Sequence, residues 1–167
     1  SLRVGLWMGK DPEFDRDFRD RFLPLQMGAS ARRRDDWIET ADGALALMVL
    51  LDQFPRNCFR GSAHSYATDG LARHYARRAV DTGFDQEIDN GLRLFFYLPF
   101  EHSEALADQD RSMELFAGIG DAELMKYAQL HHDLIRRFGR FPHRNAALGR
   151  ESTQEEIDYL ASGGFSG

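Results

Sequence analysis

The sequence predicts an all-α protein built from antiparallel helix pairs with short connections, about seven helices in all. Apolar residues recur at spacings of three and four along most of the chain, which is the spacing of one helix face. Glycine and proline stand at positions typical of helix ends. No run alternates apolar and polar residues over the length of a strand, so the pattern predicts no sheet.

The first helix is predicted to run from Pro12 to about residue 23. Asp11 is its expected N-cap, because proline is favoured at the first helical position. Pro24 is expected to end it.

The second helix, residues 43–53, is the most apolar stretch of the chain. Its run LALMVLL leaves no polar face, so we expect it to be buried all round. Pro55 is expected to end this helix, because proline cannot continue one.

Five further helices follow from the same spacing and from local end signals. Gly83 and Gly139 are predicted as C-terminal glycines, Ser103 and Asp121 as N-caps, and Pro99 as a stop. The predicted helices cover about residues 62–82, 85–98, 103–117 and 121–138, and a short last helix that opens with the capping box of residues 152–155.

Size and composition predict a single helical domain over residues 1–167. Ser1 is not a natural start, so we expect a leader to be missing ahead of it. The net charge is −6, and the longest cationic run, Arg32 to Arg34, is followed directly by two aspartates. Because nucleic-acid binding needs a basic surface, we expect no nucleic-acid partner.

Cys58 is the single cysteine of the chain. One cysteine forms no disulfide framework, which is typical of proteins from a reducing cytosol. No signal peptide is visible, and the apolar run of the second helix is too short to cross a bilayer. We therefore predict a cytoplasmic protein with no membrane partner, no metal and no cofactor.

Polar side chains cluster directly after the second helix. A near-copy of this Phe-Pro-Arg-Asn corner occurs at residues 137–145, RFGRFPHRN. Arginine binds carboxylate or phosphate with two parallel hydrogen bonds, so the two corners predict a polar ligand site inside a helical core. The alternative is that the same arginines hold structural carboxylates. The predicted ligand-binding residues are Asp52, Gln53, Arg56, Asn57, Arg60, Gln109, Arg140, His143, Arg144 and Asn145, with Gln109 included because it is polar on an apolar helix face.

Glu101 and His102 follow the predicted stop at Pro99 and are candidates for catalysis. A histidine beside carboxylates can act as a general base with an orienting partner. The alternative is plain helix capping, which we prefer for Ser103 and Glu104. If the protein is an enzyme, His102 with Glu101 is the predicted acid/base pair.

The sequence contains two weaker patterns. His102, His132, Asp133 and Asp158 can be written into the metal-binding pattern of HD-type phosphohydrolases. The alternative is a core His131 beside a surface His132. Cys58 as a nucleophile would need a histidine such as His64, and a small half-buried side chain is the simpler interpretation.

Three segments carry a family resemblance. They are residues 45–57 (LALMVLLDQFPRN), residues 99–109 (PFEHSEALADQ) and residues 137–145 (RFGRFPHRN) continued by residues 148–153. In this order they resemble the hallmark segments of a bacterial family known as domain of unknown function 924 (DUF924). The resemblance extends from Trp7 onward. It implies a TPR-like bundle of helix pairs and no particular reaction.

The sequence therefore predicts an internal pocket of arginine, histidine and carboxylate side chains that binds or processes a small anionic ligand. The alternatives are a scaffold that binds a peptide or protein in a groove between helix pairs, and an HD-type metal-dependent phosphohydrolase.

Overall fold

The computed structural model describes residues 12–167, and this part of the chain is 75% helical with no strand. It contains seven helices when α3, the π-helical turn after it and α4 are taken as one continuous helix. The all-α prediction is confirmed, whereas the TPR-like arrangement stays a prediction. None of the helices in residues 12–167 combines the length and apolarity that a bilayer span requires.

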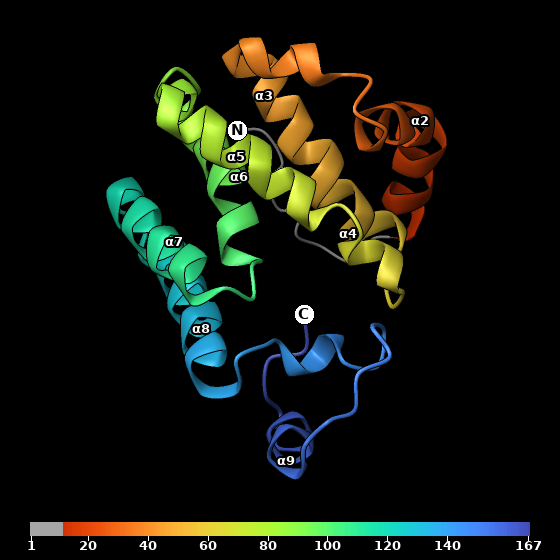
Figure 1. The fold of residues 1–167 in the computed structure, drawn as a ribbon, viewed down its shortest axis with the longest axis vertical. Helices are drawn as coiled ribbons and strands as arrows, with labels where there is room; N and C mark the ends of the chain where they lie inside the picture. The colour runs from red at the N-terminus through yellow and green to blue at the C-terminus, as the bar shows by residue number, and fades with distance from the viewer. Residues whose placement is uncertain (1–11) are drawn as a thin grey trace.

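Helix α2 (Pro12–Ser30) lies on one side of the molecule, against α4 (Figure 1). Phe18 joins the two helices, because its ring packs 5.0 Å from that of Phe54. The prediction that Pro24 ends the helix is wrong, since α2 continues through it. A proline inside a helix removes one hydrogen bond, and the buried Phe18 and Gln26 on either side anchor α2. The predicted cap, Asp11, lies outside the described residues.

A short 3-10 helix (Asp35–Glu39) leads into α3 (Ala41–Met48), whose N-cap is Thr40. The next turn, Val49–Gln53, is a π-helix, and α4 (Phe54–Cys58) continues directly from it. The predicted end before Pro55 is therefore wrong. Proline is tolerated in the first turn of a helix, and the π-turn makes Pro55 a first-turn residue of α4.

The π-turn is stabilised from outside the helix. Pro55 has no N–H to donate to the carbonyl of Leu51 four residues earlier. That carbonyl instead accepts a hydrogen bond of 2.6 Å from the hydroxyl of Thr68. This hydrogen bond satisfies the buried Leu51 carbonyl. It also ties the central helix, which is the continuous helix formed by α3, the π-turn and α4, to the start of α5.

Helix α5 (Asp69–Thr82) is preceded by a separate 3-10 turn (Ala63–Tyr66), so the predicted helix over 62–82 is in two pieces. Gly83 ends α5 with a φ of +85°, the left-handed conformation that glycine adopts without strain. After a third 3-10 segment (Phe84–Gln86), α6 (Asn90–Glu101) crosses the core. It starts later than predicted and continues past Pro99 to Glu101, because a proline near the last turn costs only one hydrogen bond.

Helices α7 (Leu106–Ile119) and α8 (Ala122–Phe138) pack on each other beside α6 (Figure 1). The prediction that Ser103 caps α7 is wrong, because Ala105 is the N-cap. Ser103 instead donates to Asp108 at 2.7 Å. The predicted ends of α8 are confirmed, with Asp121 as N-cap and Gly139 in the left-handed conformation.

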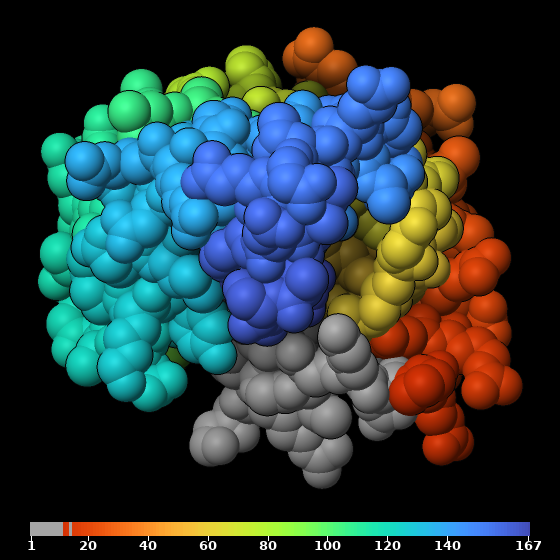
Figure 2. All heavy atoms as spheres, turned by 90° about the horizontal axis from the view of Figure 1, so that it is seen from below, coloured from red at the N-terminus to blue at the C-terminus, as the bar shows by residue number. Residues whose placement is uncertain are grey.

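The C-terminal region folds back over the bundle. A 3-10 turn (Pro142–Arg144) is followed by α9 (Gln154–Ala161), whose capping box uses Thr153 and Glu156, one residue later than predicted. Seen from below, the last residues lie between α8 and the residues that follow α4 (Figure 2). This segment closes one side of a cavity at the centre of the molecule.

Candidate functional site

The cavity has a volume of about 690 Å³. The central helix, α6, α8, the 142–144 turn and the C-terminal tail all contribute to its wall. Its lining combines ionisable and apolar side chains, namely Gln53, Arg56, Asn57, Arg60, Gly61, Ser65, Tyr66, Leu98, Glu101, His102, Phe116, Leu124, Tyr127, His131, His143, Arg144, Phe165, Ser166 and Gly167.

Asp52 lies in the π-turn, behind this wall, and is 1% exposed. Its carboxylate accepts from Gln53 Nε2 at 2.6 Å and lies 2.8 Å from His102 Nδ1 and 3.2 Å from Arg56 Nη1. Burial alone would raise the pKa of Asp52, but the Arg56 charge and the His102 and Gln53 hydrogen bonds lower it below the usual range. Asp52 is therefore an ionised carboxylate in the interior.

His102 is the C-cap of α6 and lines the cavity. Burial, and then the charge of Arg56, lower its pKa below the usual value, although Asp52 opposes the change. The ring is therefore neutral near pH 7. Ionised Asp52 can only accept a hydrogen bond, so Nδ1 of His102 must be the donor. The single ring proton is therefore on Nδ1, and Nε2 carries a lone pair. No residue of the described chain is hydrogen-bonded to that Nε2.

Glu101 is 4% exposed and also lines the cavity. Its carboxyl group makes no hydrogen bond with any described residue, and its nearest ionisable neighbour is His131 Nδ1 at 3.4 Å. That nitrogen is already bonded to the Tyr127 carbonyl, at 2.8 Å. Burial, and then the negative charge of Asp52, raise the pKa of Glu101 to about 8. Glu101 is therefore a carboxylic acid at neutral pH, beside a neutral histidine.

Arg56 is fully engaged by the protein. Its guanidinium group forms two hydrogen bonds with Asp69, of 2.8 and 3.0 Å, and a third of 2.9 Å with the Asp52 carbonyl. Burial opposes its charge, but Asp52 and Asp69 raise its pKa above the usual value. This bidentate pair ties the central helix to the start of α5.

Arg144 follows the second Phe-Pro corner as Arg56 follows the first, but it is less completely paired. It is 6% exposed, and its guanidinium lies between the Phe141 ring, at 4.4 Å, and the Tyr66 ring, at 4.7 Å. Asp69 is 3.5 Å from Nη1, and the buried Nε has no hydrogen-bond partner in the described chain. Burial, and then the charge of Arg56, lower the pKa of Arg144 to about 10. Its charge is only partly compensated.

Two further histidines border the tail. Phe165 packs edge-on against His131, at 4.8 Å between ring centroids, and against His143, at 5.3 Å. Burial lowers the pKa of His131 to about 3 and that of His143 to about 4. Both rings are neutral at physiological pH and add no positive charge to the cavity.

Comparison with known proteins identifies the family. The family described as "Bacterial protein of unknown function (DUF924)" matches residues 2–164. The chain belongs to the DUF924 family. A solved structure titled as a protein of unknown function from Agrobacterium tumefaciens is 51% identical to it, with a TM-score of 0.91 over 93% of this chain and 88% of that chain. No curated protein matches the sequence.

In this DUF924 protein, four predicted ligand-binding residues lie outside the cavity wall. Asp52 stands behind it, as described above. Gln109 donates from Nε2 to the carbonyls of Glu101 and Ser103 at 2.6 and 2.7 Å, which fixes the end of α6. Arg140 and Asn145 both bond Glu156, so they hold α9 in place. In the second Phe-Pro corner, His143 and Arg144 therefore line the cavity, whereas Arg140 and Asn145 have a structural role.

The other predicted residues line the cavity together: Gln53, Arg56, Asn57, Arg60, Glu101, His102, His143 and Arg144. The carboxylate that orients His102 is Asp52, and not its sequence neighbour Glu101. Glu104 is occupied elsewhere, since it forms two hydrogen bonds with Arg150. Sequence reasoning missed Tyr66 and Phe165, which line the cavity, and Asp69, which pairs with Arg56 behind it, because none of the three belongs to a motif.

The HD-type quartet does not assemble. His132 Nε2 lies 3.0 Å from Asp110, and Asp158 accepts a hydrogen bond from Gln154 on the exposed side of α9. Among residues 12–167, no three His, Cys, Asp or Glu side chains are grouped as a metal site requires.

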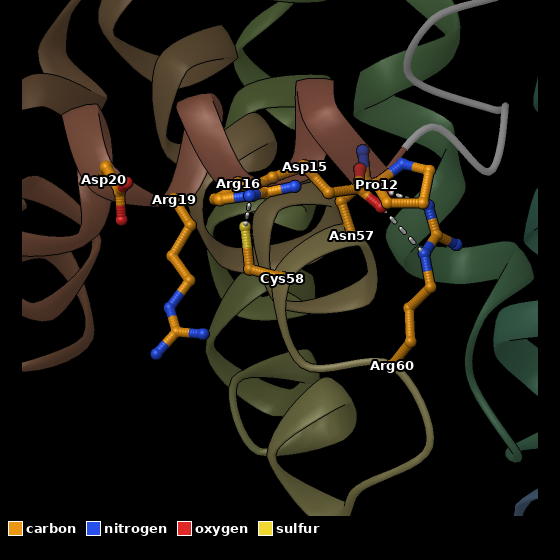
Figure 3. A pocket seen from close by; sticks show the side chains of 8 residues that line it. All are labelled: Pro12, Asp15, Arg16, Arg19, Asp20, Asn57, Cys58 and Arg60. Carbon is orange, nitrogen blue, oxygen red and sulfur yellow. Dashed lines mark hydrogen bonds and ion pairs between the residues drawn. The ribbon is translucent and has the colours of Figure 1, made fainter.

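Cys58 lies in a second, smaller cavity of about 370 Å³ between α2 and α4 (Figure 3). Its thiol points at α2 and donates to the Asp15 carbonyl at 3.7 Å, and Arg60 pairs with the carboxylate of the same residue. Burial, and then the charge of Asp15, raise the pKa of Cys58 to about 11. His64 stacks on Phe59 at 4.0 Å. A thiol of this kind is a poor nucleophile.

Proposed function

We propose that the central cavity binds a small molecule that carries a carboxylate or phosphate group, with Arg144 as its anchor. The observation that carries this proposal is the buried Arg144 guanidinium on the cavity wall, which forms no hydrogen bond with the described chain and has only Asp69, 3.5 Å from Nη1, as a charged partner. A buried charge without a full set of partners costs free energy. An anionic ligand group would supply the missing partner and would gain charge-assisted hydrogen bonds in return.

The charges around the cavity support an anion rather than a cation. Arg56 is offset by Asp52 and Asp69, and Asp69 lies closer to Arg56 than to Arg144. Glu101 and the surrounding histidines are neutral at pH 7. The charge that remains in excess is therefore that of Arg144, since Arg60 is paired with Asp15.

The size and lining of the cavity fit a metabolite. A volume of about 690 Å³ lies within the range of small-molecule sites, which is roughly 300–1,000 Å³. Leu98, Phe116 and Leu124 supply apolar wall beside the polar groups. Such a site orients a ligand through few polar contacts and binds the rest of it by apolar packing.

Calorimetric titration with sodium malonate, and separately with inorganic phosphate, tests the proposal. Arg144→Met removes the charge and keeps a long apolar side chain between the two rings. Arg136→Met, on the exposed face of α8, is the matched control. We expect the parent protein and Arg136→Met to bind at least one of the anions equally.

Arg144→Met should bind that anion about 10-fold or more weakly, since a charged hydrogen bond contributes about 1.5–3 kcal/mol. The melting curve of each variant checks that it is folded. Equal binding by all three proteins, or binding of neither anion, would contradict the proposal.

A further inference from the structure

The end of α6 presents two chemically opposite groups to the same cavity. Glu101, in the last turn, offers a buried carboxyl group with no hydrogen-bond partner in the described chain. His102, the next residue, offers Nε2, while Nδ1 is held by Asp52 at 2.8 Å. A buried polar group is nearly always hydrogen-bonded, so the open Glu101 carboxyl marks a position that a ligand would fill.

The surroundings keep these two groups in place. Gln109 holds the backbone carbonyls of Glu101 and Ser103, and Asp52 fixes the plane of the His102 ring. Asp52 is itself fixed by Gln53 and Arg56. Residues held by a second layer of hydrogen bonds are typical of catalytic sites, which need a constant geometry.

We propose that this protein catalyses proton transfer next to the carbonyl group of a small 2-oxo acid, with His102 as the base and Glu101 as the acid. The inference rests on the anion site proposed above, because Arg144 would hold the carboxylate of the 2-oxo acid. The three parts needed are an anchor for the carboxylate, a base for the C–H group and an acid for the carbonyl oxygen. The cavity wall supplies all three.

The step balances without any co-reactant. His102 Nε2 takes a proton from the carbon beside the carbonyl, and the electron pair of that C–H bond forms a C=C bond. The carbonyl π electrons move to oxygen, which takes the proton of the Glu101 carboxyl group. The products are the enol, an imidazolium and a carboxylate, and the reverse step returns a proton from the solvent-exchanged imidazolium to the same carbon.

The ionisation states agree with these roles. Burial keeps the Glu101 acid protonated, with a pKa of about 8, and keeps His102 neutral. Two titratable groups whose environments separate their protonation states in this way are typical of an acid and base pair. Among the described residues, the cavity lining contains no cysteine or lysine, and no serine or tyrosine hydroxyl is hydrogen-bonded to His102. A covalent route through a nucleophile therefore has no support in this cavity.

Deuterium incorporation tests the inference directly. The protein is incubated in D2O with pyruvate, 2-oxobutyrate or 2-oxoglutarate, and loss of the signal of the protons beside the carbonyl is followed by proton NMR. His102→Gln removes the base and Glu101→Gln removes the acid. The matched controls are His74→Gln and Glu114→Gln, whose parent side chains are exposed on α5 and α7.

We expect the parent protein and both controls to exchange at least one 2-oxo acid about 100-fold or more faster than His102→Gln, which is the lower range for general acid–base catalysis. Glu101→Gln should also be slowed. Exchange at the same rate in the parent protein and His102→Gln, for all three compounds, would overturn the inference.

Calorimetry with the same compounds separates the two proposals. Binding that Arg144→Met weakens, together with no exchange above the His102→Gln rate, overturns the acid–base inference and leaves the anion site standing. Absence of both binding and exchange overturns both proposals.

Discussion

Asp52, Glu101 and His102 show how neighbouring residues acquire different ionisation states. Asp52 receives hydrogen bonds from two side chains and lies beside the Arg56 charge, so it ionises despite its burial. Glu101 has the same burial without the hydrogen bonds, so it stays protonated. Burial disfavours charge in both, and the local partners decide which carboxyl group overcomes it.

The raised pKa of Glu101 predicts a pH-dependent stability difference. The unfolded chain releases this proton near pH 4.5, whereas the folded protein keeps it until about pH 8. The folded state therefore binds more protons between these values, and its stability falls as the pH rises through them. Glu101→Gln removes this loss.

We expect the free energy of unfolding of Glu101→Gln, relative to the parent protein, to rise between pH 5 and pH 8 by on the order of a few kcal/mol and then to level off. Urea denaturation at a series of pH values measures it, with Glu114→Gln as the control. A difference that stays constant over this range would show that Glu101 ionises normally.

The two corner arginines predict opposite effects on stability. Arg56→Met leaves Asp52 and Asp69 buried without their main partner, so we expect a loss of about 3–5 kcal/mol. Arg144→Met removes an incompletely paired buried cation and keeps the packing between Tyr66 and Phe141. Its unfolding free energy should stay within about 1 kcal/mol of the parent value or rise, as is common when a functional residue is replaced.

Chemical denaturation of both variants in the same buffer measures the contrast. Equal, large losses for the two variants would mean that Arg144 is a structural residue like Arg56, and the anion site would lose its basis.

At the scale of the elements, the π-turn places Asp52 and Gln53 at the site. A π-turn is rare and occurs frequently at functional sites. It lets the central helix continue through Pro55, and it leaves the Leu51 carbonyl to accept from Thr68. The turn therefore depends on a contact from the segment before α5.

Thr68→Val should destabilise the protein by about 1–3 kcal/mol, because it leaves a buried carbonyl without a donor. Thr82→Val is the control, since the hydroxyl of Thr82 bonds the Arg78 carbonyl at an exposed position and its loss should cost much less. Thermal denaturation compares the two variants. Equal effects would show that the Thr68 bond has no special part in holding the π-turn.

The sequence predicts those elements whose ends are set by nearby residues. Asp121 and Gly139 mark both ends of α8, and their capping chemistry is local. The sequence predicts helix ends at the prolines at 24, 55 and 99, whereas all three lie inside helical segments. What compensates for Pro55 is Thr68, and no local rule on proline includes that contact.

In the candidate site, too, local features are predictable from the sequence and contacts between distant segments are not. Residue type and spacing indicated Glu101, His102, Arg56 and Arg144, because these residues stand beside proline corners in the sequence. Their partners were not predictable, since Asp52 and His102 are 50 positions apart. The sequence also does not predict that Arg56 is fully paired while Arg144 is not. That difference arises because both carboxylate oxygens of Asp69 accept hydrogen bonds from Arg56.

At the scale of the whole molecule, the helices and the returning C-terminal segment surround the central cavity, where the neutral Glu101 and His102 share a wall with the partly compensated Arg144. The tail contributes Phe165 to the wall of this cavity. A partner protein in a groove between helix pairs stays an untested alternative.

The most direct test of the central claim is a crystal structure of the protein grown with malonate. The account predicts malonate in the central cavity, with one carboxylate within hydrogen-bond distance of the Arg144 guanidinium and the remainder beside Glu101 and His102. Malonate found only at exposed arginines or in the cavity beside Cys58, with no carboxylate at the Arg144 guanidinium at a saturating concentration, would contradict it.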